Sequence, residues 1–356
     1  MSALFLTVSC NSSEVASTAE PVIPPTSDFE AEAVIAEILA GASDDPPLPS
    51  ILDPNLVSAQ PWKIAYISKE PRVDMPKSVN DVYWYSAWLG TQETAKELNV
   101  QVEDHSIPPG VCSLHEECVL PQINIINKII EQDLADGIVI GPTDSFRLAA
   151  VIEKATESGI PVVAMDTPVD TDSILSFVVL NSYESAKEMG KWVAEQLNGK
   201  GNVLILTGPK TDQNATDRHR GILSGLSGSD IVVLDTQVAN WSETRAQEVT
   251  ADWLEEFPNI DAIFSSNDAM ALGAVSAIKA ANRDGILVTG YDGLPPAINA
   301  IRKGDLAATN HQNPLLQAEI ATRMLVQNLE KQSTFPPVVF LPGSPLITLQ
   351  NVSPKE

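Results

Sequence analysis

From Trp62 onward, short apolar segments of strand type alternate with longer segments in which apolar residues recur at helical spacing. Strands connected through helices are parallel, and the helices cover both faces of the sheet. The alternation runs through two similar rounds, which favours an α/β protein with two lobes. The last two strands allow the chain to cross back between lobes. The predicted strands are 63–68, 100–103, 137–140, 161–164, 176–179, 202–206, 231–236, 262–264, 286–289, 307–312 and 338–341.

Polar residues follow two of these strands in the segment from Asp261 to Asp292. Asn267 comes shortly after one strand, and Asp292 comes shortly after the next. The carboxyl ends of parallel strands meet at one edge of the sheet, where α/β proteins bind ligands, so we expect both side chains in one crevice. Asn donates and accepts hydrogen bonds and an ionised Asp accepts them, which suits a ligand rich in hydroxyls. The alternative is that Asn267 or Asp268 only caps the following helix.

Charge and motif content limit the functions that this chain can have. It contains 22 Lys and Arg against 47 Asp and Glu, a net charge of −25. Binding nucleic-acid phosphates requires clustered Lys and Arg, and no DNA-binding head is present, so we expect no nucleic-acid partner. The four histidines fall in no nucleophile or metal-binding spacing, and no Gly-rich phosphate motif precedes a helix. We therefore expect no enzymatic activity, no cofactor and no metal.

Two of the three cysteines, Cys112 and Cys118, lie in one segment typical of a loop, GVCSLHEECVLP. Their spacing allows a small disulfide in an oxidising compartment. Two alternatives are free thiols and a metal site that adds His115 and one further ligand from elsewhere.

The third cysteine, Cys10, ends the apolar segment MSALFLTVSC. This segment looks like the end of a bacterial lipoprotein signal, in which the cysteine carries the lipid. It lacks a basic n-region, and it is too short to span a bilayer. A secretory remnant without lipid and a chance match are the alternatives. We interpret residues 1–10 as a signal remnant whose lipid on Cys10 is the only attachment to a membrane.

Residues 11–60 are rich in Ser, Pro, Ala, Asp and Glu, a composition that cannot bury a core. We predict that they form a tether. Within it, Asp28 to Ala40 has apolar residues at helical spacing, and we favour a transient helix over a stable amphipathic one.

Six strings occur together in the order and spacing of one family. On these strings, residues from about Trp62 to Leu349 resemble the type I periplasmic sugar-binding proteins of the ribose-binding kind. The strings are GPTDS at Gly141, VVAMD at Val162, DRHRG at Asp217, SSNDAMALGA at Ser265, VTGYDG at Val288 and GDLAATNHQ at Gly304.

The resemblance implies two Rossmann-like lobes with one sugar in the cleft and hinge closure around it. Three crossovers near Asn181, Asn313 and Leu341 would give a first lobe of 61–180 plus 313–341 and a second of 181–312 plus 342–353. The family hands a monosaccharide or polyol to an ATP-driven (ABC) import permease, or in some cases to a sensor. The chain is accordingly expected to be an extracytoplasmic monomer.

The family's ligand-binding positions also carry over by motif. They fall on Asp81, Tyr83, Trp84, Asp166, Arg218, Trp241, Asn267, Asp292 and Gln312. The insertion KEPRVDMPKSVN precedes Asp81 and puts its register in question by a residue or two. Tyr83 and Trp84 have the alternative of packing in the core of an amphipathic helix. Thr167 stands where ribose binders often have Arg, so the ligand need not be ribose.

Overall fold

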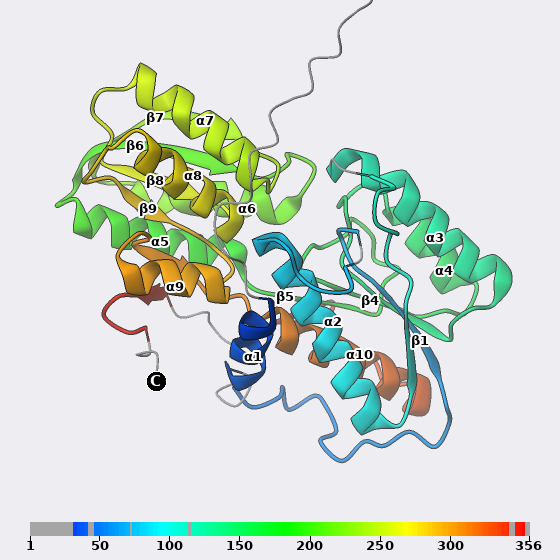
Figure 1. The fold of residues 1–356 in the computed structure, drawn as a ribbon. Helices are drawn as coiled ribbons and strands as arrows, with labels where there is room; N and C mark the ends of the chain where they lie inside the picture. Colours follow the sequence, from blue (N-terminus) through cyan, green and yellow to red (C-terminus); the bar gives the residue numbers. More distant parts are fainter. Residues whose placement is uncertain (1–30, 42–45, 72, 113–114, 342–345, 353–356) are drawn as a thin grey trace, which may run out of the picture.

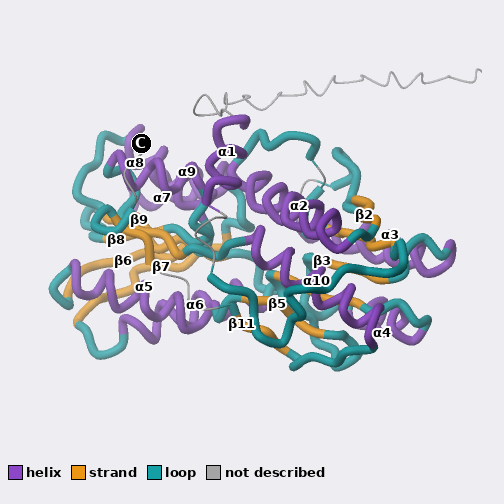
Figure 2. Tube along the Cα trace, turned by 90° about the horizontal axis from the view of Figure 1, so that it is seen from below, coloured by secondary structure: helices purple, strands orange, loops and turns teal. Residues whose placement is uncertain are grey.

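The computed structural model describes residues 31–41, 46–71, 73–112, 115–341 and 346–352. These residues form two sheets of six strands each. Helices cover both faces of each sheet, and the two lobes lie side by side (Figures 1 and 2). The predicted architecture of two Rossmann-like lobes is confirmed.

The first sheet belongs to the first lobe, and its strands are all parallel. Its order is β11-β5-β4-β3-β1-β2. The central strands are continuous apolar segments because helices bury both of their faces. The strands are β1 (Lys63–Ile67), β2 (Gln101–Asp104), β3 (Gly137–Ile140), β4 (Val162–Met165), β5 (Ser176–Val179) and β11 (Val338–Phe340).

Two pairs of helices enclose this sheet. Helices α2 (Val79–Leu98) and α10 (Pro314–Lys331) pack on one face, and α3 (Val119–Gln132) and α4 (Ala149–Glu157) pack on the other. A short 3₁₀ helix, η2 (His115–Cys118), leads into α3.

The second sheet has the order β12-β10-β9-β8-β6-β7. Only its edge strand β12 is antiparallel to its neighbour. The strands are β6 (Lys200–Thr207), β7 (Asp230–Val238), β8 (Ala262–Ser265), β9 (Leu287–Thr289), β10 (Ala308–Asn310) and β12 (Leu346–Thr348). The helices are α5 (Ser182–Gln196) and α6 (Gln213–Leu226) on one face and α7 (Glu243–Glu256), α8 (Asp268–Ala280) and α9 (Pro295–Lys303) on the other.

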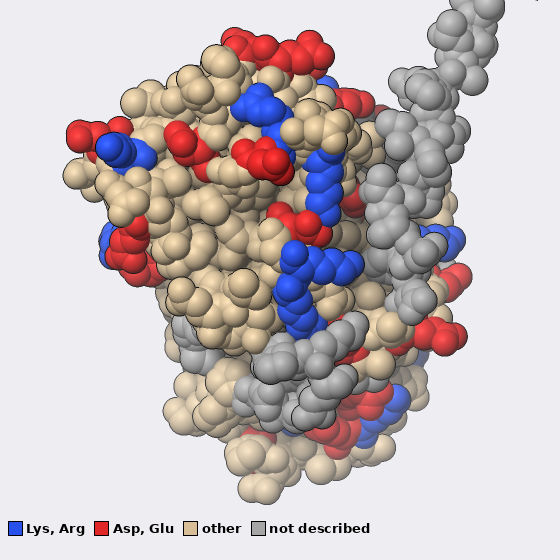
Figure 3. All heavy atoms as spheres, turned by 60° about the vertical axis from the view of Figure 1, so that its left-hand side comes forward, with Lys and Arg blue, Asp and Glu red and all other residues tan. Residues whose placement is uncertain are grey.

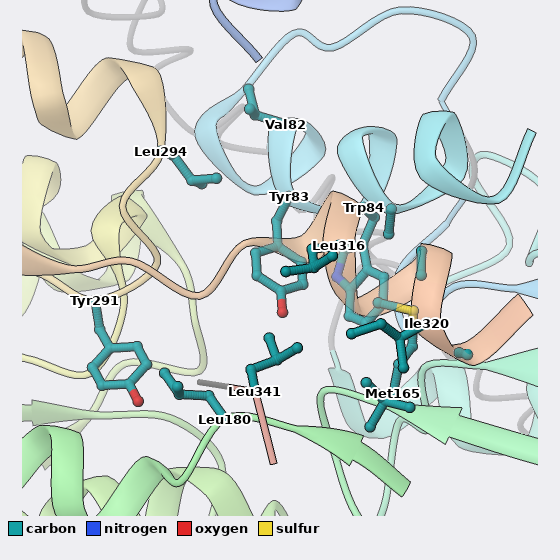
Figure 4. Packing of buried hydrophobic residues seen from close by; sticks show 14 of the residues in the cluster. Val82, Tyr83, Trp84, Met165, Leu180, Tyr291, Leu294, Leu316, Ile320 and Leu341 are labelled. Atoms are coloured by element: carbon teal, nitrogen blue, oxygen red, sulfur yellow. The ribbon is translucent and has the colours of Figure 1, made fainter. Parts of the chain in front are cut away.

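The chain passes between the two sheets three times, after β5, after β10 and after β11. Apolar side chains continue along these crossings. Figure 4 shows Leu180 and Leu341 lying between Tyr291 of the second lobe and Met165 of the first. The buried core of the first lobe is therefore continuous with the core on one face of the second.

The segment 46–60 does not belong to a tether, contrary to our prediction. Leu52 and Leu56 are buried in the core of the first lobe. Lys331 Nζ at the end of α10 lies 2.6 Å from Asp53 Oδ2, and the Ser58 hydroxyl bonds Glu330. The prediction rested on the average composition of residues 11–60, in which two leucines carry little weight. Burial of two apolar side chains is nevertheless enough to dock a short segment.

We also predicted that the helix within residues 28–40 is transient, but its described part packs against both lobes. Helix α1 (Ala31–Gly41) buries Val34 and contacts both α9 of the second lobe and α2 of the first. Predictions for Cys10 and for residues 11–30 lie outside the described residues.

Among the helices that the structure describes, each is too short or not apolar enough to cross a membrane. On the face drawn in Figure 3, Lys and Arg side chains are interspersed with Asp and Glu side chains.

Candidate ligand-binding site

A cavity of about 40 Å³ lies between the lobes, where strands of both sheets end. Its walls carry cations, carboxylates, amides and aromatic rings. The lining residues are Lys69, Glu70, Asn80, Tyr83, Trp84, Asp166, Asn214, Arg218, Trp241, Asn267, Asp292 and Gln312. Eight of the nine residues that the sequence predicted are among them. The cavity therefore lies at the carboxyl ends of strands, which is where the sequence predicted a site.

Asp81 is the exception, and Asn80 takes its place in the cavity wall. The Asp81 carboxylate accepts hydrogen bonds from the backbone N–H groups of Lys77 (2.8 Å) and Ser78 (2.9 Å). With the Ser78 hydroxyl it forms a capping box that begins α2. The insertion ahead of α2 made the family motif a poor guide to which residue faces the cavity. The Ser78–Asp81 capping box fixes where the helix starts, and so places Asn80 rather than Asp81 in the cavity wall.

Lys69, Glu70 and Asn214 also line the cavity and were missed. Lys69 follows the end of β1, so the rule about strand ends could have identified it. Asn214 lies one helical turn before Arg218 on α6, and the two side chains therefore share a face.

Asp166 is the centre of the polar network on the first lobe. Its backbone has φ 64°, a left-handed conformation, and the residue lines the cavity. The Tyr83 hydroxyl donates to Oδ1 (3.0 Å) and the Thr167 hydroxyl donates to Oδ2 (2.7 Å). The Lys69 ammonium donates to the Thr167 hydroxyl (2.7 Å). A cation therefore stands beside Asp166 even though Thr167 is not Arg.

Tyr83 and Trp84 pack in the core, which was the alternative considered for them, and they also line the cavity. Each is at least nine-tenths buried in the core cluster, and each lines the cavity. In Figure 4 both project from α2 toward the space between the lobes.

Arg218 is the central cation on the second lobe, and it is buried. Its Nη1 donates to the backbone oxygen of Ser266 (2.7 Å) and lies 4.0 Å from Asp292 Oδ1. Its guanidinium lies 3.8 Å from the centre of the Tyr291 ring. Among the described residues, none accepts a hydrogen bond from Nε or Nη2 of Arg218. These buried donors suit an oxygen-rich ligand.

The remaining polar residues follow strands β8, β9 and β10. Asn267 caps α8, since its Oδ1 accepts from the Met270 N–H (2.9 Å), and its Nδ2 donates across the cleft to Asn80 Oδ1 (3.2 Å). Asn267 therefore both caps a helix and lines the cavity. Gln312 Nε2 donates to Asp292 Oδ1 (2.5 Å).

Each lobe has one indole ring that lies beside a glycine that follows a strand. A Cβ added at Gly141, after β3, would lie 2.3 Å from the Trp84 ring. A Cβ added at Gly208, after β6, would lie 2.1 Å from the Trp241 ring. Each glycine is required because the ring occupies the space that any side chain would need.

Two neighbouring carboxyls of the second lobe have altered pKa values. Burial raises the pKa of Asp292 well above its ordinary value, Asp268 raises it further, and Arg218 opposes the change. Burial also raises the pKa of Asp268 to about 6, although hydrogen bonds from the Thr309 hydroxyl (2.6 Å) and the Leu294 N–H (2.9 Å) counteract it. The ionised form of this pair is therefore unfavourable in the ligand-free cleft.

The Asp268→Asn variant should change how stability depends on pH. Folded Asp268 holds its proton up to about pH 6, whereas the unfolded value is 3.8. The wild-type free energy of unfolding should therefore fall, relative to the variant, as pH rises from about 4 to about 6. A pKa difference of about 2 corresponds to about 3 kcal/mol. Urea unfolding of both proteins at pH 4, 5, 6 and 7 measures this difference, and parallel pH profiles would contradict it.

Cys112 and Cys118 lie close together beside α3. Their sulfur atoms are 1.95 Å apart, at bonding distance, and their Cα atoms are 5.4 Å apart. Among the alternatives considered, this geometry is that of a disulfide.

Two α/β lobes joined by three crossings, with a polar and aromatic cavity between them, define a bilobed solute-binding protein. The chain belongs to the periplasmic binding protein family, because the model described as "Periplasmic binding protein domain" matches residues 73–333. This confirms the predicted type I periplasmic sugar-binding class. Members of the family are extracytoplasmic binding proteins of transport systems and not enzymes.

Relatives and solved structures agree with this assignment. The chain is 32% identical over 238 residues to a xylitol-binding protein of Mycolicibacterium smegmatis, covering 66% of this chain and 67% of that one. It is 30% identical over 240 residues to a D-apiose import binding protein of Paraburkholderia graminis, covering 67% and 77%. An ABC transporter solute-binding protein of Actinobacillus succinogenes, solved with D-allose, has a TM-score of 0.72 at 27% identity, covering 82% and 98%.

Proposed function

We propose that this protein captures a monosaccharide or a similar small polyol between its lobes and presents it to an ABC import permease. The observation that carries the proposal is that Arg218 lines the cavity near the Asp292 carboxylate, with two buried donors, Nε and Nη2, that have no hydrogen-bond partner among the described residues. A hydroxyl that binds there can accept from the guanidinium and donate to a carboxylate. Tyr83, Trp84 and Trp241 supply ring faces for the C–H surface of a sugar.

Residues of both lobes are needed to satisfy one such ligand. Asp166, Tyr83 and Trp84 come from the first lobe, whereas Arg218 and Asp292 come from the second. Each sugar hydroxyl left without a partner costs about 1–3 kcal/mol, so a ligand favours the closed form, in which all partners are present. The closed shape is what a permease can recognise.

The identity of the ligand is best sought among those of the relatives, namely xylitol, D-apiose, D-ribose and D-allose. A thermal-shift screen of these four compounds, followed by titration calorimetry, tests the proposal. A true ligand at about 100 times its Kd should stabilise the protein by about 2.7 kcal/mol. Absence of binding by all four, and by a wider set of pentoses, hexoses and polyols, would contradict it.

A sensory role is the second candidate, because the fold also occurs in a fructose-binding periplasmic domain of a hybrid two-component system, with a TM-score of 0.71 at 22% identity. The neighbouring genes distinguish the roles. Permease and ATPase genes would indicate import, whereas a kinase or chemoreceptor gene would indicate signalling.

We further propose that lipid on Cys10 attaches the protein to a membrane and that the protein is a monomer. Metabolic labelling with an alkynyl fatty acid should mark the wild-type protein and not Cys10→Ser. Light scattering of the purified chain should give a mass near 38.2 kDa. A dimer mass or unlabelled wild type would remove the corresponding part of the proposal.

A further inference from the structure

An ion pair joins the lobes across the cleft. Lys69 follows β1 of the first lobe, and Asp212 precedes α6 of the second. Lys69 Nζ lies 2.8 Å from Asp212 Oδ2, and the two side chains are 5% and 0% exposed. Burial by itself lowers the pKa of Lys69, but the Asp212 and Asp166 carboxylates raise it above its ordinary value. Lys69 is therefore a buried cation that needs its carboxylate partners.

The same oxygen of Asp212 has a second partner. Trp241 Nε1 donates to Asp212 Oδ2 (2.8 Å), and the Trp241 backbone has φ 62°. The indole is thus fixed by a hydrogen bond as well as by its contact with Gly208. Asp212 itself does not line the cavity, so its effect on a ligand has to pass through Lys69 and Trp241.

We propose that Asp212 is a positioning residue that latches the closed lobes, by pairing with Lys69 of the first lobe while it holds Trp241 in place for the ligand. The latch rests on the proposed function, since it sets the affinity for the sugar in the cleft. Hydrogen bonds also cross the cleft, among them one from Asn214 Nδ2 to the Asp166 carboxylate oxygen Oδ2 (3.4 Å). Asn80 Nδ2 donates to the Trp241 backbone oxygen (2.8 Å), and the Gln213 N–H donates to the Ser145 hydroxyl (3.2 Å).

The pair acts on closure because the two residues belong to different lobes. When the lobes separate, Lys69 and Asp212 part and water can solvate each of them. When the lobes close, both lose water, and a charge whose partner has been removed is buried with less compensation, even though Lys69 keeps Asp166 at 3.5 Å and Asp212 keeps the Trp241 N–H. Removing one partner therefore penalises the closed form and leaves the open form unchanged. Removing both partners leaves no unpaired charge from this pair.

The test compares Asp212→Asn, Lys69→Met and the double variant in the full chain. Each single variant should bind the sugar found in the screen at least tenfold more weakly than wild type. The double variant should bind more tightly than Lys69→Met alone, because the second change removes the buried carboxylate that has lost its cation. Glu188→Gln is the matched control, since Glu188 pairs with Lys191 at 2.7 Å on the exposed surface of α5, and it should bind like wild type. Additive losses in the double variant would overturn the latch.

A second measurement needs no ligand. Spin labels at Glu157→Cys on α4 and Glu255→Cys on α7, both exposed, report the distance between the lobes in a Cys10→Ser chain. Asp212→Asn should move the ligand-free distances toward longer values. An unchanged distribution would overturn the latch even where sugar binds. A shifted distribution in a protein that binds no sugar would support the latch and count against the proposed function.

Discussion

Arg218→Ala is expected to weaken sugar binding by at least about 100-fold. Arg218 Nε and Nη2 are buried without hydrogen-bond partners among the described residues. A ligand in the cavity would therefore accept a hydrogen bond from each of them. Two hydrogen bonds from a charged donor are worth about 3 kcal/mol or more, which corresponds to about 100-fold in Kd. Titration calorimetry on the folded variant, with the sugar found in the screen, measures the loss.

Arg220→Ala is the matched control, because Arg220 lies two residues further along the same helix. Its side chain is exposed and lies 3.7 Å from Asp217 on the surface. This variant should bind sugar like wild type. If both variants bound equally well, Arg218 would not contact the ligand.

Asp292→Asn should separate binding from stability. The change keeps the shape of the side chain but removes the charge that accepts a ligand hydroxyl, so affinity should fall by on the order of 10- to 100-fold. Without sugar, the melting temperature at pH 7 should not fall and is expected to rise. Burial and Asp268 raise the pKa of Asp292, which makes its ionised form unfavourable in the ligand-free protein.

Calorimetric titration and thermal melts of the same preparation measure the two effects. The control is Asp305→Asn, which makes the same chemical change in the same lobe, where Asp305 pairs with Lys279 at 2.7 Å outside the cleft. It should leave affinity unchanged. A fall in melting temperature with unchanged affinity in Asp292→Asn would assign Asp292 to the scaffold rather than to the site.

Much of the cavity could be predicted because its residues follow strands. Asp166, Asn267 and Asp292 come within a few residues of a strand end, and parallel strands place those ends together whatever the loops do. Arg218 and Trp241 were found only through the resemblance, since no local pattern distinguishes Arg218 from Arg220.

The two failures have different origins, one in a local helix cap and one in a contact between distant residues. Asn80 rather than Asp81 lines the cavity because a capping box fixes the start of α2. Segment 46–60 packs on the first lobe because Leu52 and Leu56 find a surface built by α2 and α10. Neither contact leaves a periodic pattern in the sequence.

The sequence by itself determined the two α/β lobes and the polar character of the edge at which their strands end. Hydrophobic periodicity sets strands and helices locally, and parallel connection sets the edge at which their loops gather. Only the tertiary structure decided that Lys69 meets Asp212 across the cleft and that Arg218 keeps two donors free within the described part of the chain. These relations depend on how two lobes close on each other, and a distance of a few ångströms between residues far apart in the chain is not encoded in local spacing.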